Sequence, residues 1–231
     1  MNYYVTGDKH QDYAGLFSKI ELAKLGENDT IIVLGDMGLF WRNDKKDADA
    51  IIKFYEDNYT CNLWFIDGNH ENHPLLKALP IVDKLGYVSP HIRYIPRGTV
   101  LDLGGCRCLF IGGAESIDKA FRQEGLSWWK DETITEDDIS NIENQHYDYV
   151  FSHTCPESVF NEYRFLLCST NVLKMTDDTE CHISEKRLEQ VKNNISFDNW
   201  WFGHFHQDVT LNDNFACLLH GFKEIRNKEE I

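Results

Sequence analysis

Cysteine pairs, long apolar runs and positive charge are all scarce in this chain. The seven cysteines include no C-x-x-C pair, which argues against a zinc finger or a disulfide framework and favours reduced, mostly buried thiols. No apolar run approaches the ~18 residues that a membrane-spanning helix needs. The opening residues, MNYYVTGDKH, have neither the basic region nor the apolar region of a secretory signal peptide. We therefore expect a cytoplasmic protein.

Acidic residues outnumber basic residues by 38 to 23, which gives a formal net charge of −15. Such a chain repels phosphate backbones and anionic membrane surfaces, so extended nucleic acid and membranes are disfavoured as partners. A small anionic substrate is still compatible with this charge, because bound metal ions can reverse the local potential inside a pocket.

Short apolar runs alternate with amphipathic stretches in the first third of the chain. Runs at 3–5, 31–34 and 63–66 predict buried strands, and the stretches 13–25 and 48–55 predict helices between them. This alternation predicts a parallel sheet with right-handed crossovers. A length of 231 residues with 42% hydrophobic content is enough for one domain with a sizeable core. Without an internal repeat or a linker, we expect one mixed α/β domain over 1–231.

The second half of the chain has a different pattern. Gly104-Gly105 lies between two apolar runs and predicts a β-hairpin. Thr135 with Asp138 three residues later is a capping-box signature, which predicts a helix that runs towards His146. The remaining expected elements are strands at 149–151 and 199–202, helices at 157–168 and 185–193, and an antiparallel pair at 209–211 and 216–219.

Five short segments that follow apolar runs carry oxygen and imidazole groups. In open α/β sheets, ligands bind beyond the carboxyl ends of the strands, so we expect these segments to converge on one crevice. Oxygen and imidazole donors without thiolate suit borderline divalent metals such as manganese, iron or zinc. The side chains concerned are those of Asp8, His10, Asp36, Asn69, His70, His153, His204 and His206.

Taken singly, several of these segments have ordinary explanations. Asp8-x-His10 is a pattern that occurs by chance, Gly35-Asp36 is typical of a strand-to-loop turn, and His153 alone is typical of a semi-buried histidine. Gly-Asn-His-Glu at 68–71 is the most specific segment. Gly-His-x-His at 203–206 directs two imidazoles to one side of an extended chain. Their joint occurrence in this order, each after a strand, favours a metal site.

The complete series resembles the motifs of the calcineurin-like metallophosphoesterases, and it extends from residue 7 to residue 206. The resemblance implies a four-layer α/β/β/α sandwich of two mixed sheets flanked by helices, with a binuclear metal centre at the strand ends. It implies that Asp36 bridges the two metal ions and that His70 is catalytic without being a ligand. The remaining ligands would be Asp8, His10 and His206 for one ion, and Asn69, His153 and His204 for the other.

The resemblance also implies a reaction. Two divalent ions ~3.5–4 Å apart can bridge a hydroxide that attacks phosphorus, while both ions neutralise charge on the phosphoryl oxygens. His70 would act as general acid towards the departing oxygen. We therefore expect a metallophosphoesterase, a phosphodiesterase or a phosphatase, with a small phosphate-ester substrate that could be nucleotide-like. Manganese is the expected metal, with iron, zinc, cobalt or nickel as alternatives. The competing functions are nuclease-like cleavage of nucleic acid ends and a non-catalytic metal-binding scaffold for a protein partner.

Several positions beside the expected ligands depart from the pattern of protein serine/threonine phosphatases. Those enzymes resemble G-D-x-x-D-R-G around the bridging aspartate, whereas this chain reads GDMGLFW. Leu39 and Phe40 therefore replace an orienting aspartate and a phosphate-binding arginine, and Gln11 replaces a glycine. These departures weaken a protein phosphatase assignment and place phosphodiesters ahead of monoesters. Glu71 is expected either to hydrogen-bond a ligand imidazole or to be a surface carboxylate at a helix start.

Two segments could bind the substrate. Arg42 lies a few residues beyond the expected bridging aspartate, within reach of a phosphate. Arg122 and Trp128 lie in the stretch 112–129, where arginine would match a phosphate bidentately and tryptophan would stack a base or form a pocket wall. The alternatives are an i,i+4 ion pair between Arg122 and Asp118, and core or lid packing for Trp128.

Overall fold

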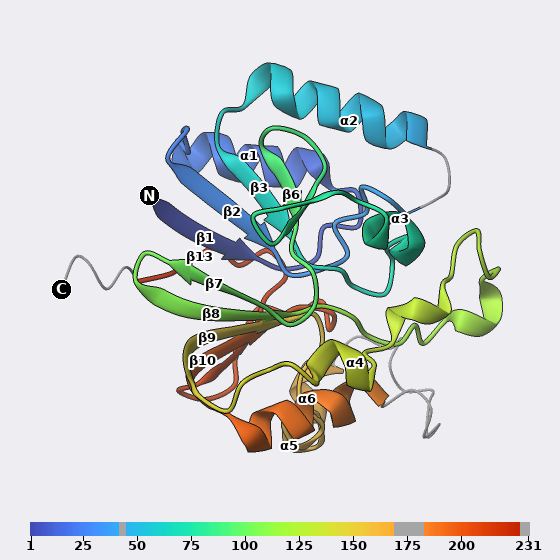
Figure 1. Cartoon of the computed structure of the whole chain (residues 1–231), viewed down its shortest axis with the longest axis vertical. Coiled ribbons are helices and arrows are strands. Elements are labelled where there is room, and N and C mark those ends of the chain that lie inside the picture. Colours follow the sequence, from blue (N-terminus) through green and yellow to red (C-terminus); the bar gives the residue numbers. More distant parts are fainter. Residues whose placement is uncertain (42–44, 169–182, 227–231) are drawn as a thin grey trace.

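The computed structural model describes residues 1–41, 45–168 and 183–226. Two β-sheets pack face to face, and helices cover the outer face of each sheet (Figure 1). The first sheet has the strand order β13-β1-β2-β3-β6-β5-β4, and the second has the order β11-β12-β10-β9-β8-β7. The expected four-layer sandwich of two mixed sheets is confirmed.

The first sheet is built from the β-α-β alternation at the start of the chain. Its four central strands are parallel, and short antiparallel strands extend both edges. The strands are β1 (Asn2–Thr6), β2 (Asp29–Val33), β3 (Asn62–Phe65), β4 (Ile81–Val82), β5 (Leu85–Tyr87), β6 (Ile92–Tyr94) and β13 (Lys223–Glu224). The helices are α1 (Tyr13–Ala23), α2 (Lys45–Asn58) and α3 (His73–Lys77).

The second sheet begins with the predicted hairpin and continues with parallel strands. Its strands are β7 (Thr99–Leu103), β8 (Cys106–Ile111), β9 (His146–Ser152), β10 (Ser196–Phe202), β11 (Val209–Thr210) and β12 (Phe215–Cys217). Its helical elements are η1 (Lys119–Phe121), η2 (Lys130–Glu132), α4 (Glu136–Ile139), α5 (Glu157–Leu167) and α6 (Ile183–Asn194). In Figure 1, α5 and α6 lie below this sheet, on the side away from the first sheet.

The hairpin and the capped helix that were predicted in the second half of the chain are both present, but the helix is shorter than predicted. The hairpin turns at Gly104 and Gly105, which both have positive φ. The capping box between Thr135 and Asp138 is present, but α4 ends at Ile139 instead of running towards His146. His146 begins β9, where it pairs with Ser196 of β10, so sheet formation overrides the local helical preference.

Apolar packing forms three layers. One cluster fills the space between the sheets, and its centre includes Val5, Ile32 and Phe110. A second cluster lies under α5 and α6, and a third lies under α1 and α2. Five of the six described cysteines are buried, and all six are thiols that are not part of a disulfide. Within the described ranges, no helix is long and apolar enough to cross a membrane.

A buried ion pair ties the two halves of the sandwich together near the end of β3. The side chain of Arg97 is 6% exposed, and its guanidinium donates to Asp67 at 2.6 Å and to Asp138 on α4 at 3.1 Å. It also donates to the carbonyl of Thr133 at 2.8 Å. Because Asp67 is fully buried, removal of its cationic partner would leave an uncompensated charge in the interior.

We expect Arg97→Leu to lower the free energy of unfolding by about 3–5 kcal/mol, the cost of breaking a buried pair on one side. Urea unfolding followed by tryptophan fluorescence measures this change. Lys53→Ala is the matched control, because Lys53 and its partner Asp57 are 76% and 57% exposed and the free energy of unfolding should barely change. Similar small losses in both variants would contradict a stabilising role for Arg97.

Candidate metal centre

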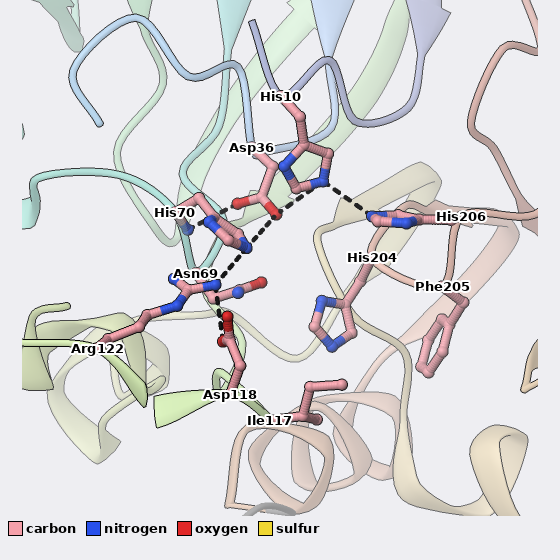
Figure 2. Close-up of a pocket in the computed structure, with 10 residues that line it drawn as sticks. All are labelled: His10, Asp36, Asn69, His70, Ile117, Asp118, Arg122, His204, Phe205 and His206. Carbon is pink, nitrogen blue, oxygen red and sulfur yellow. Dashed lines mark hydrogen bonds and ion pairs between the residues drawn. The ribbon is translucent and has the colours of Figure 1, made fainter. Parts of the chain in front are cut away.

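The five predicted segments meet where strands of both sheets end. They follow β1, β2 and β3 in the first sheet and β9 and β10 in the second. Figure 2 shows six of the eight predicted side chains around a cavity of about 380 Å³. Its lining comprises His10, Asp36, Asn69, His70, Ile117, Asp118, Arg122, His204, Phe205 and His206. The other two predicted residues, Asp8 and His153, are buried directly behind it and contact the lining side chains.

One group of donor atoms belongs to Asp8, His10 and His206. Nε2 of His10 lies 2.8 Å from Nε2 of His206 and 3.6 Å from Oδ2 of Asp8. Nε2 of His206 lies 3.4 Å from the same oxygen of Asp8. Donors bound at ~2.0–2.2 Å to one ion lie roughly 3 Å apart, so this group has the spacing of ligands to a single divalent metal.

A second group of donor atoms belongs to Asp36, His153 and Asn69. Nε2 of His153 lies 3.4 Å from Oδ2 of Asp36 and 3.2 Å from Oδ1 of Asn69. The same Oδ2 of Asp36 is 3.5 Å from Nε2 of His10. One carboxylate oxygen therefore adjoins both groups, which is the position that a bridging ligand would occupy.

His204 lies at the margin of the second group. Its ring centroid is 5.0 Å from that of His153, and it lines the cavity. Across the described residues, His204 is absent from the sets of three donor side chains whose ligand atoms lie within 4.8 Å of one another. Its backbone N–H donates to Asp8 Oδ1 at 2.9 Å, so the loop holds the ring close to the centre.

The tautomer of His153 suits metal binding. Nδ1 contacts the carbonyl oxygen of Leu34 at 2.7 Å, so Nδ1 donates and Nε2 faces the donor group, the arrangement typical of metal-binding histidines. Burial alone would lower the pKa of His153, but the carboxylates of Asp36 and Asp8 raise it to about 10. The surroundings therefore favour positive charge at Nε2, and a divalent ion would bind there by displacing a proton.

Four of the predicted residues have strained backbones. His10, Asp36, His204 and His206 have φ values of 45°, 47°, 67° and 53°, in the left-handed region that costs non-glycine residues of order 1 kcal/mol or more. Gln11 has a φ of 70°, a conformation that glycine would adopt without strain. Such strain persists where surrounding contacts enforce it and is typical of functional sites.

Glu71 connects the segments after β2 and β3, and both sequence-based interpretations of it were wrong. Its carboxylate is fully buried and accepts the backbone N–H groups of Gly68, Gly38 and Asp36 at 2.6, 3.1 and 3.3 Å. It therefore neither contacts a ligand imidazole nor lies at the surface. Burial and the Asp36 carboxylate raise the pKa of Glu71 to about 8.

Two glycines allow the segments to approach each other. Gly35 has a φ of 86°, and a Cβ there would collide with Nδ1 of His153. A Cβ on Gly68 would collide with Oδ1 of Asp36. At Gly68 a side chain is therefore excluded by the space that the Asp36 carboxylate occupies.

A chain of polar side chains behind Asn69 was not predicted from the sequence. Nδ2 of Asn69 donates to Oγ of Ser116 at 3.1 Å, which turns Oδ1 towards His153. Ser116 in turn donates to Glu132, which is 1% exposed. No local pattern marks Ser116 or Glu132, because they reach the centre from the segment between β8 and α4.

The three residues that were predicted to contact the substrate differ in their position relative to the cavity. Arg122 lines the cavity. Trp128 lies outside this lining, and its ring is covered by Nζ of Lys119 at 4.4 Å from the ring centroid. The neighbouring Trp129 is buried. Arg42 falls outside the described residues.

Comparison with known proteins assigns the family. The family model described as calcineurin-like phosphoesterase matches residues 1–208 of the 231-residue chain, so the chain belongs to that family. A comparison with curated proteins finds no match. Family membership and the donor groups together support a metal-dependent hydrolase of phosphate esters.

We expect Glu71→Ala to weaken manganese binding by about 10- to 100-fold, the usual effect of removing a group that orients metal ligands. Competition titration of metal-stripped protein measures the affinity. Glu71→Gln, which keeps one acceptor oxygen, should lose less. Glu27→Ala removes an exposed carboxylate and serves as the control. An unchanged manganese affinity in folded Glu71→Ala would show that Glu71 does not support the centre.

Proposed function

We propose that this protein is a phosphoesterase with two divalent metal ions and that it acts on a small phosphodiester or phosphomonoester. The observation that supports the proposal best is the shared oxygen of Asp36, which lies 3.5 Å from Nε2 of His10 and 3.4 Å from Nε2 of His153. An oxygen between two donor groups is suited to bridging two ions. Manganese is the proposed metal, because the donors are carboxylate, carboxamide and imidazole.

The proposed ligand sets follow the two donor groups. Asp36 would belong to both sets. Asp8, His10 and His206 would complete the first set, while Asn69, His153 and His204 would complete the second. When bound, the two ions supply an activated water as nucleophile and positive charge for the phosphoryl oxygens.

His70 is the proposed general acid. Its Nε2 is 4.0 Å from Oδ2 of Asp36, outside hydrogen-bond distance, and its ring lines the cavity. The side chain therefore adjoins the proposed bridging ligand and still faces the space where a substrate would bind. A proton donor in that position serves the departing oxygen of the ester.

The cavity suits a small substrate. Ile117 and Phe205 form apolar parts of its wall beside His204, on the side away from His10 and Asp36 (Figure 2). Leu39 is buried and Phe40 packs against the same apolar cluster, so these two positions do not offer the polar contacts that their counterparts in protein phosphatases would. We therefore place phosphodiesters ahead of phosphomonoesters as substrates.

We expect metal-stripped protein to hydrolyse bis-p-nitrophenyl phosphate after manganese is added back, and more slowly to hydrolyse p-nitrophenyl phosphate. Asp36→Asn should abolish turnover because it weakens both ligand sets. His70→Ala should lower kcat by about 10²–10⁴-fold on an ester whose leaving group needs a proton, the range for a positioned acid.

The control is His220→Ala, which removes an exposed histidine outside the cavity lining. Equal activity of Asp36→Asn and the unsubstituted protein would contradict the proposed centre. Absence of turnover with manganese, iron, zinc, cobalt and nickel would favour the scaffold function instead.

A further inference from the structure

Among the described residues, no carboxylate hydrogen-bonds the imidazole of His70, because Oδ2 of Asp36 is 4.0 Å from Nε2. The backbone N–H of His70 donates to Oδ1 of Asp36 at 2.8 Å, but that bond fixes the main chain and leaves the ring unattached. Ring atom Nδ1 is buried, and none of the described residues gives it a hydrogen-bond partner. Leu39 is 4% exposed among apolar side chains. The ring must therefore be oriented by another group.

That group is Arg122, which comes from the segment between β8 and α4. Nη2 of Arg122 lies 2.7 Å from Nε2 of His70 (Figure 2). Because a guanidinium has only donors, Nε2 accepts this hydrogen bond, and the proton of the neutral ring lies on Nδ1. The contact determines which edge of the His70 ring faces the cavity.

Arg122 is itself held in place. Nη2 also contacts Oδ1 of Asp118 at 2.7 Å across the short η1 turn. The Arg122 side chain is 8% exposed, whereas that of Asp118 is 49% exposed. The i,i+4 ion pair considered from the sequence therefore exists, and the same guanidinium reaches His70 as well. An arginine that is buried and anchored in this way loses little further freedom when it orients a neighbour.

Aromatic rings enclose the sides of His70. The ring of Trp41 meets it at a centroid distance of 4.6 Å and an interplanar angle of 72°. The ring of His10 meets it at 4.9 Å and 83°. These edge-on contacts restrict tilting of the imidazole but do not select which ring nitrogen faces the cavity. The hydrogen bond from Arg122 makes that selection.

We propose that Arg122, anchored by Asp118, is the positioning residue of His70 and replaces the carboxylate that position 39 lacks. This inference rests on the proposed function, in which His70 serves the departing oxygen. Arg122 keeps Nε2 directed at the cavity before substrate arrives, and such orientation in advance lowers the barrier of the later step. Nε2 then accepts the proton that the attacking water loses, which breaks the hydrogen bond from Arg122, and donates that proton to the departing oxygen. Direct binding of the phosphoryl group by Arg122 in the resting arrangement is the competing role.

A double-mutant cycle on two esters separates these roles. We expect Arg122→Ala and His70→Ala each to lower kcat by about 10²-fold on a phenyl ester, whose leaving group needs a proton, and far less on the matching p-nitrophenyl ester. KM should change little for either ester. The double variant should lose no more than His70→Ala alone, because residues that act as one unit are not additive.

The competing role predicts a different pattern. If Arg122 binds the phosphoryl group directly, Arg122→Ala raises KM for both esters alike, and its loss multiplies with that of His70→Ala. That result would overturn the proposal. Lys119→Ala, on the same turn, is the control and should leave both esters unaffected. Thermal melting confirms that each variant folds, and Arg122→Lys and Asp118→Asn should give intermediate losses with the same dependence on the leaving group.

A spectroscopic readout tests the contact without turnover. Long-range ¹H–¹⁵N correlation of the imidazoles in metal-stripped protein should show His70 protonated at Nδ1 with Nε2 as acceptor. Arg122→Ala should shift the Nε2 resonance, while Lys119→Ala should not. An unshifted resonance would overturn the proposal. Because this spectrum needs no activity, it decides the contact even if the protein shows no metal-dependent turnover, an outcome that would count against the proposed function alone.

Discussion

One carboxylate oxygen organises the site. Oδ2 of Asp36 lies 3.4, 3.5 and 4.0 Å from ring nitrogens of His153, His10 and His70, and the residue is 1% exposed. A buried carboxylate needs positive charge close to it. Protonated imidazoles and the proposed metal ions would both supply that charge. The remaining polar groups of Asp36 are also used: its N–H binds Glu71, and its carbonyl accepts the N–H groups of Lys9 and His10.

This arrangement explains why the surrounding backbone is strained and yet well supported. Asp36 and three neighbouring histidines have positive φ, and the hydrogen bonds from Gly68 and Gly38 to Glu71 hold the adjoining segments in register. Because the segments follow strands of both sheets, the donor atoms keep their spacing only while the sandwich keeps its packing. Stability at the strand ends and geometry of the centre are therefore coupled, as expected for a site that is organised before its ligands bind.

The sequence predicted the donor set because its signals are local. Each donor segment follows an apolar run, and parallel strands bring such segments to one edge. The residues that hold these donor segments in place have no such local signal in the sequence. Glu71 acts through backbone amides of two separate segments, Ser116 orients Asn69 from 47 residues away, and Arg122 reaches His70 across 52 residues. These are tertiary contacts, which periodicity and spacing do not record. The same limit applies to α4, which ends at Ile139 although its capping box predicted a helix that runs towards His146.

The most direct measurement of the central claim is electron paramagnetic resonance during titration of metal-stripped protein with manganese. Two ions bridged by one carboxylate are close enough for their spins to couple. The account predicts two bound equivalents with the spectrum of an exchange-coupled pair, and loss of that coupling in Asp36→Asn. A single bound equivalent, or two equivalents with the spectrum of isolated ions, would contradict it.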